Sequence, residues 1–281
     1  MTALLLALGA AGSYGLSDFW SGVLSRRHHY LWVALVGQLA STVIALVVAL
    51  VTTPGGLGGI PSVLSGAVIG WGLLAAVGNA FGSAMLMKGL GEGAMHVAGP
   101  LSAVLAAGLP VLLGLALGER PAVLALVGIA VALPAVWLVA GFERGAVSAA
   151  GVREGVLAGV GFAVFFIVIA QAGDGAGAWP VAVCQVGTAL ATAGWVSAAR
   201  APGSVRGTLG AVWPGAAGGT AALLYFFATR EGLLTVVAVV TSLYPAVTVL
   251  LAGRFLHERP SRAQLYGLGL AAAAVVAIAM G

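Results

Sequence analysis

The sequence predicts an all-α, polytopic membrane protein with ten transmembrane helices, arranged as two inverted repeats of five helices each. Three observations lead to this prediction. The 281-residue chain is 61% hydrophobic and 7% charged, whereas about a quarter of the residues in a soluble globular domain are charged. Its apolar runs have the length of about 20 residues that a helix needs to cross the hydrocarbon core. The charge pattern of the first half of the chain also recurs in the second half.

Candidate spans are separated by charged residues and by clusters of proline and glycine. The spans are residues 3–24, 31–51, 64–87, 94–117, 122–141, 154–171, 178–198, 209–229, 233–253 and 263–280. They are too long for the strands of a membrane barrel, and they lack the alternation of polar and apolar residues that barrel strands have. Connections such as 52–61 (TTPGGLGGIP) and 200–207 (RAPGSVRG) have the composition of loops.

The recurring charge pattern has a fixed offset of 139 residues. Glu92 begins an uncharged run that ends at residues 119–121, and Glu231 begins a run, interrupted by Arg254, that ends at residues 258–260. Both runs end in Glu-Arg-Pro. This pattern indicates an internal duplication of a membrane-spanning unit. We therefore expect one repeat in residues 1–143 and a second in 151–281, joined by the polar connection FERGAVSAAGVR (142–153).

The two repeats are expected to be inverted, because each has an odd number of helices. The loop after the first span carries Arg26 and Arg27, but its counterpart after the sixth span carries only Asp174. The loop after the second span has no basic residue, whereas the loop after the seventh span carries Arg200 and Arg206. The basic residues have changed sides between the halves, as inverted repeats require.

Counting the loops places most basic residues on one side of the membrane, with only Arg120 and Arg230 on the other. Those on the basic side are Arg26, Arg27, Lys88, Arg144, Arg153, Arg200, Arg206, Arg254, Arg259 and Arg262. The positive-inside rule then puts both termini outside the cytoplasm.

The duplicated segments are PVLLGLALGERPAVLALVG (110–128) and TVLLAGRFLHERPSRAQLYGLG (248–269), accompanied by SYGLSDFWSGVLSRR (13–27) and SLYPAVTVLLA (242–252). They resemble the EamA repeat of the drug/metabolite transporter superfamily. The resemblance implies a ten-helix secondary transporter in the cytoplasmic membrane, with a central cavity between the repeats. Members of this superfamily are often drawn with both termini in the cytoplasm, against the charge count, so the orientation stays open.

Asp18 is the strongest candidate for a functional residue. It precedes Arg26 by two helical turns, which places it about 12 Å inside the loop. A carboxylate at that depth is expected to face protein or a water-filled cavity. Tyr14, Asp18, Ser21 and Ser25 share one helix face by their spacing of 4, 3 and 4 residues. This stripe indicates a proton site or a site for a cationic substrate, with a structural aspartate as the alternative.

The span 64–87 carries a second group of candidate substrate-binding residues. Asn79 is followed one turn later by Ser83, and Trp71 lies two turns earlier on roughly the same side. Together they are expected to line a cavity wall. An interhelical hydrogen bond from Asn79 is an equally good interpretation.

The span 233–253 carries a third group. Thr241, Tyr244 and Thr248 form a stripe, and Pro245 frees a backbone carbonyl near Thr241. A freed carbonyl and a tyrosine hydroxyl suit a polar ligand in the middle of the membrane. A proline kink that only serves helix packing is the alternative.

Acidic residues at helix ends and glycines within the spans are assigned structural roles. Glu92 and Glu231 are placed at turns before helices, where a carboxylate is favoured by the positive helix N-terminus. Glu119 and Glu258 are expected to fix helix ends at the membrane interface. Glycines such as Gly70, Gly78 and Gly82 are interpreted as packing residues, because small residues let helices approach closely in lipid.

Several other functions are disfavoured by motifs that the sequence lacks. There is no GxxxxGK[ST] for ATP and no HExxH or paired carboxylates for a membrane enzyme, so we expect no catalytic residues. Cys184 is the only cysteine, and no metal site or cofactor is expected. The expected partners are a small-molecule substrate and the lipid bilayer, not nucleic acid, with the protein acting as a monomer or homodimer.

The sequence therefore predicts alternating-access transport of a small metabolite or drug-like solute, with proton coupling through Asp18 as a hypothesis. The alternative is a non-transporting membrane scaffold or sensor that binds a small solute. The direction of transport, import or efflux, stays open.

Overall fold

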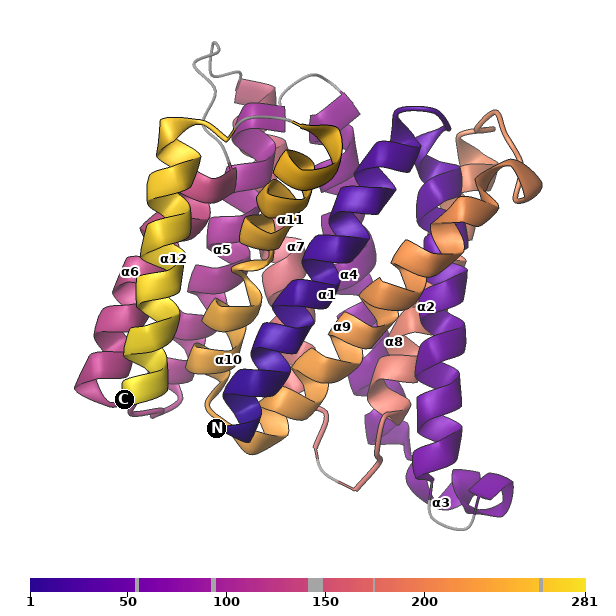
Figure 1. Ribbon diagram of the computed structural model, residues 1–281. Coiled ribbons are helices and arrows are strands. Elements are labelled where there is room, and N and C mark those ends of the chain that lie inside the picture. The colour runs from indigo at the N-terminus through magenta and orange to yellow at the C-terminus, as the bar shows by residue number, and fades with distance from the viewer. Residues whose placement is uncertain (54–55, 92–94, 141–148, 174, 258–259) are drawn as a thin grey trace.

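The computed structural model describes residues 1–53, 56–91, 95–140, 149–173, 175–257 and 260–281, which form a bundle of helices without strands (Figure 1). The long helices are α1 (Thr2–Ser25), α2 (Tyr30–Thr52), α4 (Gly66–Gly91), α5 (Met95–Ala116), α6 (Val123–Ala140), α7 (Ala149–Ala170), α8 (Trp179–Ala198), α9 (Val212–Glu231) and α12 (Arg262–Met280). Between α9 and α12 lie α10 (Leu234–Thr241), α11 (Tyr244–Leu251) and the π-helical turn η3 (Ala252–Leu256). Three short elements complete the fold, η1 (Gly56–Gly59), α3 (Ile60–Val63) and η2 (Arg206–Ala211).

Length and hydropathy make this a multi-pass membrane protein. Within the described residues, seven segments are long and apolar enough to cross a membrane, including α2, α4, α7, α8 and α12. The described apolar parts of α5 and α6 are shorter. Helix α1 is not among these segments, because its stripe of polar residues lowers its mean hydropathy. Ten spans are consistent with this architecture, in which a long helix or a helix pair covers each sequence-predicted span.

The ninth span is not one helix, as the continuous range 233–253 had suggested, but two helices separated by Ser242 and Leu243. Pro245 is the physical reason, because it has no N–H to donate to the carbonyl of Thr241. The chain tightens here instead: the Leu243 N–H donates to the Val240 carbonyl at 3.2 Å, and the Ala246 N–H donates to the Leu243 carbonyl at 2.9 Å. Both are hydrogen bonds over three residues, typical of a helix that has been interrupted.

Two predicted loops also contain helix. The connection 52–61 was expected to be loop because of its prolines and glycines, but its residues 56–61 lie in η1 and in α3, which continues to Val63. Helix α7 begins at Ala149, so the second part of the connection 142–153 is helical, while residues 142–148 lie outside the described part of the chain.

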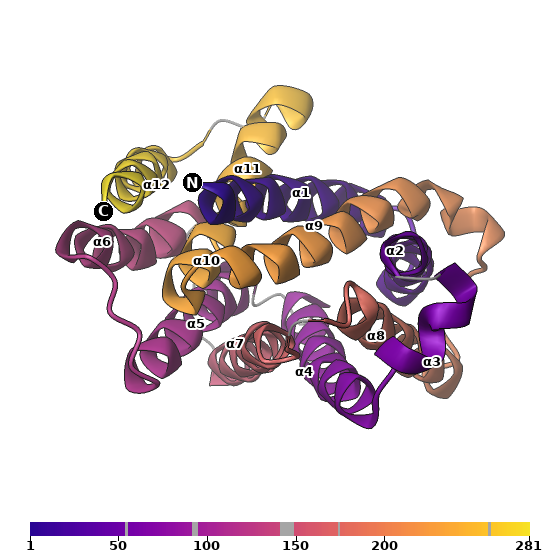
Figure 2. The ribbon, with the colours of Figure 1, turned by 90° about the horizontal axis from the view of Figure 1, so that it is seen from below.

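The helices pack most extensively in the pairs α4 with α7, α6 with α12, and α1 with α9. Helices α1 and α9 cross the middle of the bundle, and both termini lie at the same end of it (Figures 1 and 2). Glycines bring α4 and α7 into close contact. A Cβ atom on Gly78 would lie 2.7 Å from the Phe165 backbone nitrogen, and one on Gly82 would lie 2.9 Å from that of Phe162. The packing role expected of these two glycines is confirmed, whereas Gly70 has open space around it.

Glu119 fixes the start of α10 from the other half of the chain. Its Oε1 accepts a hydrogen bond from the Leu234 N–H at 2.7 Å, and its Oε2 accepts one from the Thr235 N–H at 2.9 Å. A Cβ on Gly114 would lie 2.6 Å from Glu119 Oε2, so a glycine is needed for this approach. The expectation that Glu119 fixes a helix end is therefore confirmed.

The helix-capping role assigned to Glu231 is wrong. Glu231 is the exposed last residue of α9, and the carboxylate on the first N–H groups of α10 is that of Glu119. Spacing along the chain favoured the nearer carboxylate, but the fold brings the more distant one to the helix end. Glu92 and Glu258 lie outside the described residues.

Candidate functional site

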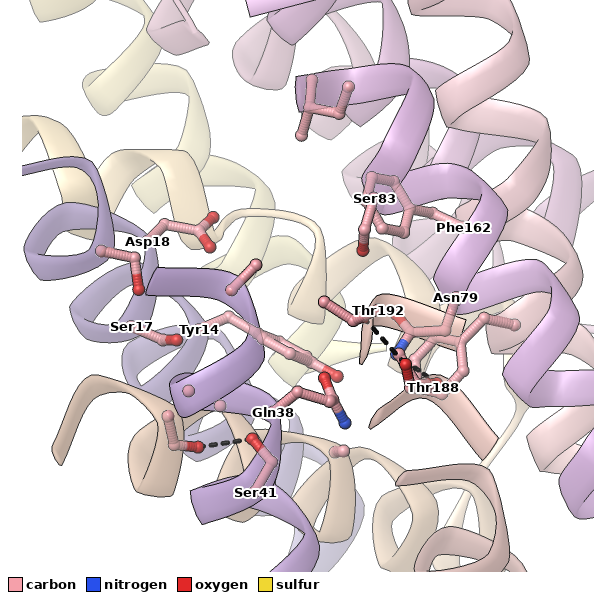
Figure 3. Close-up of a pocket in the computed structure, with 18 of the residues that line it drawn as sticks. Tyr14, Ser17, Asp18, Gln38, Ser41, Asn79, Ser83, Phe162, Thr188 and Thr192 are labelled. Atoms are coloured by element: carbon pink, nitrogen blue, oxygen red, sulfur yellow. Dashed lines mark hydrogen bonds between the residues drawn. The ribbon is translucent and has the colours of Figure 1, made fainter. Parts of the chain in front are cut away.

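A cavity of about 240 Å³, lined by polar, aromatic and small side chains, lies within the bundle (Figure 3). Helices α1, α2 and α4 of the first half and α7, α8 and α9 of the second supply its walls, and α5 and α11 add one residue each. Its lining runs from Tyr14 in the middle of α1 to Ser25 at the end of α1 and Tyr30 at the start of α2. The cavity therefore extends from mid-bundle to the end where α1 and α2 are joined, opposite to the termini.

Helix α1 presents its predicted polar stripe to this cavity. Tyr14, Asp18, Ser21 and Ser25 all line it, together with Ser17. A period of 3.6 residues per turn places these side chains on one face of the helix. The Asp18 side chain is exposed on the cavity wall rather than packed between helices. Among the described lining residues Asp18 is the only charged one, so the described wall carries a negative group without a basic partner.

The opposite wall holds amide and hydroxyl groups in fixed positions. Gln38 Nε2 on α2 donates to Gln185 Oε1 on α8 at 3.1 Å and to the Gln185 carbonyl at 3.3 Å. Asn79 Nδ2 on α4 donates to Thr188 Oγ1 at 3.3 Å. Figure 3 shows Asn79 and Ser83 across the cavity from Asp18. For Asn79 both sequence-based interpretations hold, because it lines the cavity and also bridges two helices.

Aromatic rings form the inner end of the cavity. The Tyr14 ring lies edge-on to Phe166, with centroids 6.4 Å apart, and lies 6.2 Å from Tyr244. Tyr225 packs against Phe166 and is completely buried. Its hydroxyl donates a hydrogen bond to the Phe166 carbonyl at 3.0 Å. The faces of aromatic rings attract cations, so this aromatic end and Asp18 favour the same charge on a ligand.

Five of the eight substrate-binding candidates predicted from the sequence come together in the cavity lining, and three do not. The five are Tyr14, Asp18, Asn79, Ser83 and Tyr244. Trp71 is 37% exposed and is not part of the lining. Thr241 is fully buried within α10. The Thr248 hydroxyl donates to the carbonyls of Gly15 and Tyr244, both at 3.3 Å, and so serves contacts between helices and within α11.

These three positions have separate physical reasons. Trp71 lies two turns from Asn79, and eight residues rotate an α-helix beyond two full turns, which moves the ring out of the wall. The helix break at Ser242 and Leu243 removes the single periodicity that had placed Thr241 on the same face as Tyr244. Thr248 remains one turn after Tyr244 on α11, but its hydroxyl is bonded to the carbonyls of Gly15 and Tyr244.

The sequence also offers Gln38, Gln185 and Tyr225 as lesser cavity candidates, of which Gln38 and Gln185 line the cavity and Tyr225 does not. Thr188 and Thr192, which complete a polar stripe on α8, were missed. Gln185, Thr188 and Thr192 line the cavity with spacings of 3 and 4 residues, the same signal that identified the stripe on α1. Ser41 on α2, whose hydroxyl donates to the Gly215 carbonyl at 2.6 Å, also lines the cavity. Phe162, Phe165 and Phe166 line it as well, but an apolar residue in an apolar span gives no signal in the sequence.

Glu154 on α7 is a further intramembrane acid that the sequence analysis did not single out. It is fully buried, and its Oε1 pairs with the Arg153 guanidinium at 2.8 Å. Glu154 is not part of the cavity lining. The sequence analysis did not select Glu154 because it directly follows an arginine, and adjacent charged residues are typical of a loop.

The arrangement suits reversible binding of a small solute. It offers one carboxylate, neutral donors and acceptors, and aromatic faces, all of them from rigid helices. Within the described part of the chain, no three histidine, cysteine, aspartate or glutamate side chains come close enough to hold a metal ion.

Comparisons with known proteins agree with this picture. Residues 150–280 match the model of the EamA-like transporter family, which confirms the resemblance seen in the sequence. A solved structure titled "Crystal structure of protein" has a TM-score of 0.76 and 17% sequence identity to this chain, and the alignment covers 99% of this chain and 96% of that one. This likeness establishes the fold over nearly the whole length. No curated protein matches the sequence.

Proposed function

We propose that this chain, whose second half matches the EamA-like transporter family, is a secondary transporter that moves a small solute across the cytoplasmic membrane by alternating access. The observation that carries the proposal is the cavity itself. It contains polar side chains from several helices, it reaches one end of the bundle from the middle, and both halves of the chain contribute its walls. A site at mid-membrane between two similar halves is the arrangement from which alternating access follows, because one half can rock against the other.

Inverted repeats in residues 1–143 and 151–281 are part of this proposal, and three features of the packing support them. The contact of α4 with α7 has its counterpart in α9 with α1, and that of α2 with α9 has its counterpart in α8 with α4. The direction of the helices supports inversion. Helix α4 runs antiparallel to α7, since Gly78 contacts Phe165 and Gly82 contacts Phe162. Leu86 on α4 and Ser25 at the end of α1 line the same cavity toward one end, so α7 begins where α1 finishes.

The third feature is the pair Gln38 and Gln185. These two residues lie on α2 and α8, the second helix of each half, and they are hydrogen-bonded to each other. A contact between the second helices of the two halves is expected where a pseudo-twofold axis passes between those helices. Because a single chain supplies every described wall of the cavity, one chain is sufficient for a complete site, whether the protein is a monomer or a homodimer.

Asp18 is proposed as the site at which solute movement is coupled to a proton. It is the charged group of the described lining and is exposed to the cavity. A carboxylate inside the membrane is costly unless it is hydrated, paired or protonated. Its proton and a cationic group of the solute would therefore compete for one position, which is a simple way to exchange one for the other.

The experiment begins with a solute screen on the purified protein, because only ligands that favour the folded state raise its melting temperature. The best solute is then tested in proteoliposomes loaded with a pH-sensitive dye, with a pH gradient imposed across the bilayer. The parent protein and Asp18→Glu are expected to move protons when the solute is added, and Asp18→Asn is not. Binding of the solute without movement across the bilayer would favour a sensor or scaffold. An Asp18→Asn protein that responds to the gradient like the parent would remove Asp18 from the coupling step.

A further inference from the structure

A second cavity of about 250 Å³ adjoins the central one between α2, α4 and α8. The two cavities share four lining residues, Tyr30, Ala34, Ser83 and Thr192. The second cavity, called the side chamber below, has five residues of its own, Leu31, Ala84, Trp195, Ala198 and Ala199. A ligand that fills the central cavity can therefore extend into the side chamber at the level of Ser83 and Thr192.

The walls of the two spaces differ in chemistry. The central cavity has Asp18, Gln38 and Asn79, whereas the residues that belong to the side chamber alone are all apolar. Hydroxyl groups of Tyr30, Ser83 and Thr192 lie only where the two spaces meet. A polar group placed in the side chamber would lose hydrogen bonds to water without gaining new ones. An apolar group makes no hydrogen bonds to water, so it loses none when it enters the side chamber.

The side chamber is also built on helices that are held in position. Helix α8 packs against both α2 and α4. Trp195 and Tyr30 pack around the buried cluster of Leu31, Leu35 and Val196. The ring and the aliphatic side chains that form the chamber are thus part of a packed patch, so its shape is available before a ligand arrives.

We propose that the side chamber binds the apolar part of an amphipathic ammonium solute, whose positively charged head lies in the central cavity near Asp18. This rests on the function proposed above and adds a substrate class to it. The head is recognised by the carboxylate of Asp18 and the aromatic faces of Tyr14 and Tyr244. The apolar part is selected by size, because the side chamber has a volume of about 250 Å³.

The experiment uses the n-alkylammonium ions from methylammonium to hexylammonium as probes. Their affinity for the purified protein is measured from the concentration dependence of thermal stabilisation. Burial of one methylene favours binding by roughly threefold to fourfold. The affinity is therefore expected to rise by about that factor for each carbon, and to level off once the chain fills the chamber.

Two variants fill the side chamber without touching the central cavity. Ala84→Trp and Ala198→Trp change residues that line only the side chamber, one on α4 and one at the end of α8. Both are expected to abolish the dependence on chain length while methylammonium binds as it does to the parent. Leu190→Trp is the matched control, because Leu190 is also on α8, is 70% exposed and lines neither cavity. This control is expected to keep the full chain-length dependence.

Three results would overturn the proposal. One is chain-length dependence that persists in both filled variants, and another is its absence in the parent, as expected if a lipid acyl chain occupies the side chamber. The third is a parent protein that binds none of the amines. Each of these results is distinguishable from a failure of the proposed transport function, because that function is decided by the broader solute screen and the proteoliposome assay, which do not depend on amines.

Discussion

The contact between Glu119 and the start of α10 gives a direct test of the fold, because it joins distant parts of the chain through two hydrogen bonds. Both bonds are short, 2.7 and 2.9 Å, and both use a carboxylate as acceptor. The first residues of a helix have N–H groups without partners in the helix, and α10 has no side-chain cap from its own N-cap residue. Replacement of Glu119 by glutamine keeps the size of the side chain but puts an NH₂ group opposite one of the two N–H donors.

The expected destabilisation follows from these contacts. Loss of a helix cap costs about 0.5–2 kcal/mol, and loss of the negative charge at a helix N-terminus costs about 0.3–1 kcal/mol more. Because the Glu119 side chain is half-buried, water can hydrogen-bond to the N–H groups and offset part of this loss. We expect Glu119→Gln to lower the free energy of unfolding by about 1–3 kcal/mol. At about 2–4 °C for each kcal/mol, the melting temperature should fall by about 2–12 °C. The measurement is thermal unfolding of the purified protein in detergent, followed by tryptophan fluorescence.

Glu231→Gln is the matched control for this experiment. Glu231 precedes α10 directly in the sequence, but it is exposed at the C-terminal end of α9. A negative charge is unfavourable at that end of a helix, so its removal should leave the melting temperature unchanged or slightly higher. Equal shifts for the two variants, or a larger shift for Glu231→Gln, would refute the assignment of Glu119 as the residue that fixes α10.

Three further predictions follow from single contacts. Gly78→Ala should strongly reduce the yield of folded, monodisperse protein, because the new Cβ would lie 2.7 Å from a backbone nitrogen of α7. Gly70→Ala on the same helix is the control: its Cβ meets nothing within 4 Å, so this variant should behave like the parent. Tyr225→Phe removes a buried hydrogen bond of 3.0 Å and should cost about 0.5–1.5 kcal/mol, measured as a melting temperature lowered by a few degrees; an unchanged value would argue against the contact. Asp18→Asn should make solute binding less dependent on pH in thermal-shift titrations, since it removes the ionisable group of the described lining, and an unaltered pH profile would contradict this.

The sequence was most informative where a local period of the helix carried the signal. The stripe of Tyr14, Asp18, Ser21 and Ser25 needs only one helix to be recognised, and all four residues line the cavity. The stripe of Gln185, Thr188 and Thr192 on α8 carries the same period and could have been found in the same way. Apolar lining residues such as Phe166 could not, because in a membrane span most residues are apolar whichever way they face.

Positions that depend on two helices at once were decided by the tertiary structure. Nothing in the spacing of the chain says that Glu119 rather than Glu231 meets the start of α10, or that Trp71 turns away from the wall that Asn79 and Ser83 form. These outcomes depend on helix rotation and on close approach at glycines, which are properties of packing between segments far apart in the sequence.

By itself, the sequence determined that the protein spans the membrane with helices, where nearly all of those helices lie, and which face of α1 is polar. It did so because the apolar thickness of the bilayer and the period of the helix are constraints that act within each segment. Only the tertiary structure decided which polar faces meet, and that they enclose a central cavity with an apolar chamber beside it. That choice belongs to the packing of eight helices against one another, for which no single segment carries the information.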